Sequence, residues 1–93
     1  MRRQELSIRG LNLKDQTFGQ LVAPLSHLYY LDISNCKELS PIAITDLTAS
    51  NKSLRTLKMS NCKRAVNDEA LTFVASSLKD LQVLDIVTPR ASN

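Results

Sequence analysis

The sequence predicts an α/β solenoid in which strand–helix units of similar length stack side by side. The segment 28–36, LYYLDISNC, and the segment 54–62, LRTLKMSNC, place their leucines, serine, asparagine and cysteine identically. The segment 81–86, LQVLDI, repeats the first part, and the offsets between the three segments are 26 and 27 residues. A fixed period of about 20–29 residues with an L-x-x-L-x-L core indicates a repeat array. Strands separated by a helix in this way must run parallel.

The repeat extends back to the start of the chain. Leu6 and Ile8 occupy the places of Leu31 and Ile33, and Arg3 stands where a strand leucine is expected. A single domain of residues 1–93 is therefore predicted to hold about 3.5 repeats, at about 3–27, 28–53, 54–80 and a partial 81–93.

The second half of each unit predicts a helix. In each unit, residues that are mostly apolar recur at the spacing of one helical face. They are Phe18, Leu21, Val22 and Leu25 in the first unit, Ile44, Leu47, Thr48 and Asn51 in the second and weakest, and Leu71, Val74, Ala75 and Leu78 in the third. Ser40-Pro41 predicts an N-cap followed by a helix-starting proline. Asn67 predicts a second cap, with acids in the first turn, and Asp15 is expected to play the same part in the first unit.

Each unit therefore runs from a strand through a loop and a helix to the next strand. The crossovers are expected to be right-handed. The strands are expected to line the concave face of the solenoid and the helices its convex face. The pattern Leu-x-x-Leu-x-Ile-Ser-x-Cys, followed by a capped helix, resembles the cysteine-containing leucine-rich repeats of F-box proteins. The stretch 67–71, NDEAL, resembles the helix start of that family. The resemblance implies a solenoid that binds proteins, as in substrate recognition for ubiquitin transfer.

Two departures from the family pattern matter. Leu25, Asn51 and Leu78 stand where the family usually has a second cysteine. The Asn51 amide would then point toward the core, where it needs hydrogen-bond partners. The second departure is that no F-box sequence precedes the repeats, so a ligase role would need a further segment or a separate chain.

Composition excludes several classes. The chain is 43% hydrophobic with a net charge of +3, and its basic residues are scattered among acids rather than gathered in a nucleic-acid stripe. No apolar run reaches the roughly 18 residues of a membrane span, and no secretory signal is evident. Cys36 and Cys62 are expected to be stacked, buried free thiols. These features predict an intracellular protein of the cytoplasm or nucleus, with mitochondria as the alternative compartment.

Strand alternation predicts a partner-binding surface. Leu31 and Ile33 point inward, so the residues between them point to the concave face. Lys58 is expected to lie between Asp32 and Asp85 across neighbouring strands, which either avoids like charges or forms a binding patch with Tyr30. The candidate partner-binding residues are Tyr30, Asp32, Ser34, Thr56, Lys58, Ser60, Val83 and Asp85.

No catalytic pattern accompanies this surface. His27 is interpreted as a turn residue, and the two cysteines lack zinc-ligand spacing. We therefore predict a non-enzyme with no cofactor, metal, small-molecule substrate or nucleic-acid partner. Its expected function is protein–protein interaction, as a small structural or assembly subunit of a larger complex or as a fragment of a longer repeat protein. The alternative is the substrate-recognition array of an F-box-type ubiquitin ligase. In either case another chain or copy is expected to cover the open ends of the stack.

Overall fold

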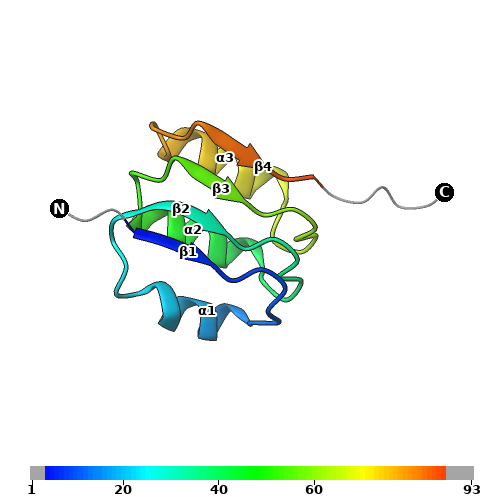
Figure 1. Ribbon diagram of the computed structural model, residues 1–93. Coiled ribbons are helices and arrows are strands. Elements are labelled where there is room, and N and C mark those ends of the chain that lie inside the picture. The colour runs from blue at the N-terminus through cyan, green and yellow to red at the C-terminus, as the bar shows by residue number, and fades with distance from the viewer. Residues whose placement is uncertain (1–3, 88–93) are drawn as a thin grey trace.

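Four parallel strands form one sheet in the order β1-β2-β3-β4. The computed structural model describes residues 4–87 (Figure 1). The strands are β1 (Gln4–Ser7), β2 (Leu28–Asp32), β3 (Thr56–Lys58) and β4 (Val83–Asp85), and the helices that connect them are α1 (Asp15–Val22), α2 (Pro41–Ser50) and α3 (Asp68–Ser77). The three helices lie on one side of the sheet, which leaves its other side open (Figure 1). The predicted α/β class and parallel sheet are confirmed. Arg3 and residues 88–93 lie outside the described residues.

The strand register agrees with the repeat alignment from Glu5 onward, whereas Gln4 pairs with Leu28 across an irregularity between Gln4 and Glu5. Leu31 pairs with Leu57 and Leu57 with Leu84, so the strand leucines form one column. The strands are shorter than the apolar pattern suggests, since β4 covers three residues of the segment 81–87. Backbone hydrogen bonds nevertheless continue beyond them, as the Asn61 N–H donates to the Val87 carbonyl at 2.8 Å.

Two of the three predicted helix caps are confirmed. The Ser40 hydroxyl accepts from the Ile42 N–H ahead of Pro41, and the Asn67 side chain accepts from the Ala70 N–H at 2.7 Å. Asp15 was expected to cap α1 and to place an acid in its first turn; the acid is there, but the expected cap is wrong. Lys14 occupies that position without a side-chain cap, and the Asp15 carboxylate instead accepts from the backbone N–H and the hydroxyl of Ser40. Asp15 thus joins the starts of α1 and α2.

The core lies between the sheet and the helices. Leu31 and Leu57 from the strands and Ile33 just after β2 are fully buried in one cluster with Phe18 and Leu47 from the helices. The second unit had the weakest apolar pattern, yet its helix is the most completely buried because α1 and α3 flank it on both sides. By contrast Leu21 and Ala75, which were expected to face the core, are exposed, because α1 and α3 each have a described helix on one side only.

Side-chain hydrogen bonds connect neighbouring strand–helix units within the core. The Cys36 thiol donates to the Ile8 carbonyl at 3.1 Å, and the Cys62 thiol donates to the Ile33 carbonyl at 3.0 Å. Both cysteines are free and buried, as predicted. Burial raises the pKa of each thiol, because the thiolate would lose its hydration there. These thiols are therefore structural hydrogen-bond donors at neutral pH.

Asn51 is fully buried with both ends of its amide engaged. Its Oδ1 accepts from the Leu28 N–H at 3.1 Å, and its Nδ2 donates to the Leu47 carbonyl at 3.4 Å. The expectation that a core amide needs partners is met, and the end of α2 is thereby joined to the start of β2.

A repeated turn follows the strands, and the sequence pattern did not reveal it. Gly10, Asn35 and Asn61 occupy equivalent places with φ of 77°, 65° and 58°. Asparagine and glycine tolerate this left-handed conformation better than other residues. The Asn61 Nδ2 donates to Asn35 Oδ1 at 2.8 Å, so consecutive turns are also bonded through their side chains. The repeated Ser-Asn-Cys tripeptide was the signal that could have predicted this turn.

Candidate functional site

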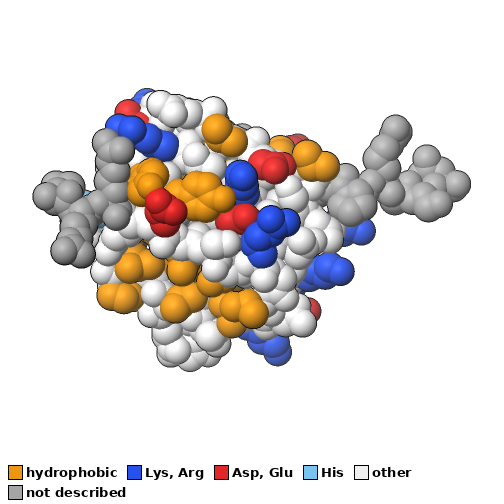
Figure 2. All heavy atoms as spheres, in the orientation of Figure 1, with side chains coloured by type: hydrophobic (Ala, Val, Ile, Leu, Met, Phe, Trp, Pro, Cys, Tyr) orange, Lys and Arg blue, Asp and Glu red, His pale blue; other side chains and the backbone are white. Residues whose placement is uncertain are grey.

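The side of the sheet that faces away from the helices is the candidate site, and we call it the open face. Figure 2 shows side chains of both charge signs gathered near the middle of this view, over the strands. The open face is formed by the outward-pointing residues of the strands and of the segments that follow them: Glu5, Ser7, Arg9, Tyr30, Asp32, Ser34, Thr56, Lys58, Ser60, Val83, Asp85 and Val87.

Lys58 and Tyr30 form the central pair of the open face. The Lys58 Nζ lies 5.7 Å from the centroid of the Tyr30 ring, within the range of a cation–π contact. Both residues are half-buried on the open face. Thr56 lies beside Tyr30 on β3, and Val83 continues that row on β4, where it is exposed.

Asp32 is placed on this face but is almost inaccessible. It is 3% exposed, its Oδ1 accepts from the Ser34 N–H at 3.0 Å, and its Oδ2 lies 3.6 Å from the Arg9 Nε. Ser34 is equally buried, and its hydroxyl accepts from the Ser60 N–H at 3.2 Å. Asp32 and Ser34 therefore lie on the predicted face with little exposed surface, and their polar atoms bond within the chain.

Asp85, at the end of β4, is equivalent to Asp32 at the end of β2. The Ser60 hydroxyl donates to its Oδ1 at 2.8 Å, and the Val87 N–H donates to the same oxygen at 3.2 Å. The Ser60 bond is the main reason that the pKa of Asp85 is lowered, followed by the Val87 bond. The positive charges of Lys58 and Arg9 act in the same direction. These interactions favour the ionised form of Asp85.

The charged residues on neighbouring strands do not form the ion pairs that were expected. Asp32, Lys58 and Asp85 are neighbours across the strands, as predicted. Among the described residues, however, Asp32 forms its ion pair with Arg9, while Lys58 contacts the Tyr30 ring and no carboxylate within 4.0 Å. Lys58 therefore presents a cation whose charge is available to an approaching group.

His27 lies at the surface, in the segment that precedes β2. The Ser26 hydroxyl lies 3.1 Å from His27 Nδ1 in an exposed turn, and the His27 N–H donates to the Gln4 side chain. Within residues 4–87, no three histidine, cysteine or acidic side chains lie close enough to hold a metal ion. In the same part of the chain, no helix is long and apolar enough to cross a membrane.

Comparison of the chain with models of known protein families and with curated proteins finds no match. The geometry of the open face is therefore the basis on which a function is assigned.

Proposed function

We propose that this chain is a leucine-rich repeat solenoid that acts as a non-catalytic protein–protein interaction module, and that its partner binds the open face. The ordered strand register and the thiol bonds from one unit to the next support a solenoid, because they recur with the sequence repeat. The same repeat supports the leucine-rich repeat class, because each strand–helix unit completes the core of its neighbour.

The observation that carries the proposal is the Tyr30–Lys58 pair on an open sheet surface. Tyrosine is enriched at the centres of protein interfaces because it buries a large apolar area and offers a polar tip. The ring and the ammonium group are already positioned by the cation–π contact at 5.7 Å, so less conformational freedom is lost when a partner binds. A cation held this way favours an acidic or carbonyl-rich partner surface.

The edges of the sheet support a place within a larger assembly. Leu84 on β4 is 39% exposed, whereas its equivalents Leu31 and Leu57 are fully buried. Val87 beside it is also exposed, and at the opposite edge Leu11 is exposed in the first unit. We infer that another chain or a second copy of this chain covers these edges.

Quantitative capture from native cells tests the open face. The double variant Tyr30→Ala, Lys58→Glu removes both central groups, and Lys52→Glu makes the same charge reversal in an exposed turn after α2. We expect the double variant to lose the proteins that wild type and Lys52→Glu both capture, with its melting temperature unchanged. Equal capture by all three chains would contradict the assignment of the open face.

The identity of the captured proteins separates two roles. A fixed set of neighbours at equal stoichiometry would indicate a structural or assembly subunit. A cullin scaffold and its adaptor, recovered with several substoichiometric clients, would instead indicate a substrate-recognition array for ubiquitin transfer. Capture that depends on the edge residues and not on Tyr30 would move the interface to the ends of the sheet.

A further inference from the structure

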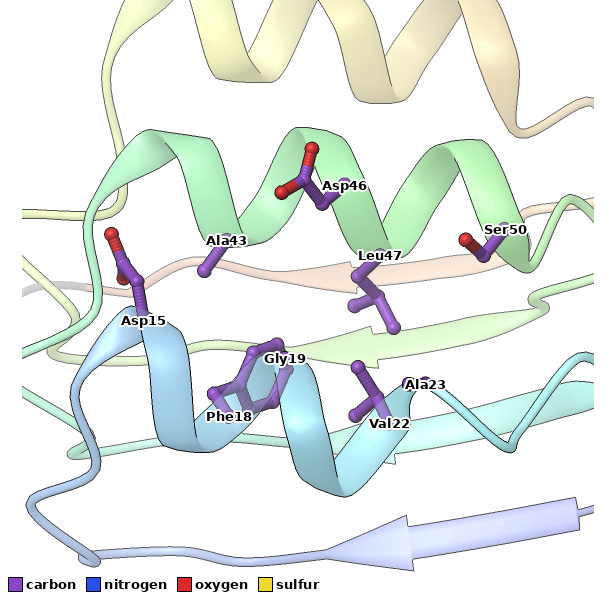
Figure 3. A pocket seen from close by; sticks show the side chains of 9 residues that line it. All are labelled: Asp15, Phe18, Gly19, Val22, Ala23, Ala43, Asp46, Leu47 and Ser50. Atoms are coloured by element: carbon purple, nitrogen blue, oxygen red, sulfur yellow. The ribbon is translucent and has the colours of Figure 1, made fainter.

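A groove separates α1 from α2 on the helix side of the molecule, away from the open face. Its volume is about 210 Å³. Figure 3 shows Phe18 and Val22 on α1 and Ala43 and Leu47 on α2 directed into the space between the helices. These four side chains are almost completely buried, so the floor of the groove is apolar.

Gly19 lines this groove between Phe18 and Val22 on α1. A Cβ added at Gly19 would have no heavy atom within 4 Å, and its backbone does not have the positive φ that requires glycine. The equivalent places in α2 and α3 hold Thr45 and Thr72. Glycine inside a helix lowers stability relative to alanine, yet neither backbone strain nor close packing explains it here. A residue that lowers stability and has no structural reason at its position is typical of a functional position.

The charges at the groove have one sign. Among residues 4–87 its ionisable lining residues are Asp15 and Asp46, with no lysine or arginine, although the whole chain carries a net charge of +3. Asp15 is held in place by its bonds to Ser40. Asp46 is exposed and has no hydrogen-bond or ion-pair partner among residues 4–87. The groove therefore combines an apolar floor with a negative rim.

We propose that this groove binds a single lysine or arginine side chain presented by a protein partner. The apolar stem of such a side chain would lie on Phe18, Val22 and Leu47, and its cation would meet the carboxylate of Asp46 at the rim. The size agrees with this occupant, because pockets for small-molecule ligands usually measure about 300–1,000 Å³ and this groove is smaller. This binding place is independent of the open face.

A titration of the ¹⁵N-labelled chain with N-acetyl-arginine amide tests the proposal through the amide resonances. We expect weak, saturable shifts at Gly19 and Ala43, smaller shifts with N-acetyl-glutamine amide, and none with N-acetyl-glutamate amide. Gly19→Leu should abolish the shifts by filling the groove, while its melting temperature stays equal to or above that of wild type. Asp46→Asn, an exposed change that preserves the fold, should weaken binding about two- to fivefold.

Three results would overturn the proposal. They are an absence of saturable shifts at the groove, equal shifts with the arginine and glutamine probes, and unchanged shifts in Gly19→Leu. Shifts confined to Tyr30 and Lys58 would place the cation-binding site on the open face and would also count against the groove.

Discussion

Replacing Asn51 with alanine should destabilise the protein strongly, although the residue lies far from the open face. The change removes the acceptor of the Leu28 N–H, which lies 3.1 Å from Asn51 Oδ1 at the start of β2. The equivalent N–H groups of Leu54 and Leu81 use backbone carbonyls instead, at 3.3 Å each. Leu28 thus relies on a side chain where its equivalents do not.

The magnitude follows from leaving this buried donor without a partner. Such a loss costs about 1–3 kcal/mol, and both Asn51 and Leu28 are fully buried, so water cannot replace the acceptor. We expect Asn51→Ala to lower the free energy of unfolding by about 2 kcal/mol. For a chain of this size, that is a fall in melting temperature of about 8–16 °C.

Circular dichroism during thermal and urea unfolding measures both quantities. Asn12→Ala, an exposed change of the same kind, is the control and should stay within about 0.5 kcal/mol of wild type. Asn51→Leu copies the residue found at the equivalent places in the first and third units and should still be less stable than wild type. The reasoning is refuted if Asn51→Ala matches the control, or if Asn51→Leu is at least as stable as wild type.

Three further predictions concern caps and ionisation. Asn67→Ala should lower the free energy of unfolding in urea by about 1 kcal/mol, because Ala70 loses its capping acceptor; an unchanged urea midpoint would count against the cap. Because burial raises the pKa of Cys36 and Cys62, their contribution to stability is fully present below about pH 8.5 and is lost as pH rises through the folded pKa. The double alanine variant should therefore show a flatter alkaline melting profile. The lowered pKa of Asp85 has the opposite sign: its contribution is present above about pH 4 and is lost as pH falls through the lower folded pKa. Asp85→Asn should flatten the acid side of the profile, and an identical profile would contradict this.

The periodic parts of the fold could be predicted from the sequence. The leucine column and the capped starts of α2 and α3 follow from patterns that repeat within the chain. The burial of α2 could not be predicted in the same way. Thr48 and Asn51 are polar, and their full burial depends on helices that flank them on both sides.

The face of the sheet on which each candidate site residue lies could be predicted, but its burial and its hydrogen-bond partners could not. Alternation places Asp32 on the same face as Tyr30, yet it does not show that Arg9 and the Ser34 N–H take both carboxylate oxygens. The bond from Asp15 to the start of α2 was missed for the same reason, because it joins residues 25 positions apart. The groove beside Gly19 could not be predicted from the sequence either, because the space next to a glycine depends on how the helices pack.

Site-directed photo-cross-linking in native cells tests the central claim most directly, because it reports which face touches a partner. A photoreactive phenylalanine derivative would replace Tyr30 on the open face in one chain and Thr72, exposed on α3, in another. If the open face binds the partner, the residue at position 30 forms a discrete protein adduct that Lys58→Glu suppresses, and the residue at position 72 does not form that adduct. An adduct from position 72 with none from position 30 would contradict the assignment.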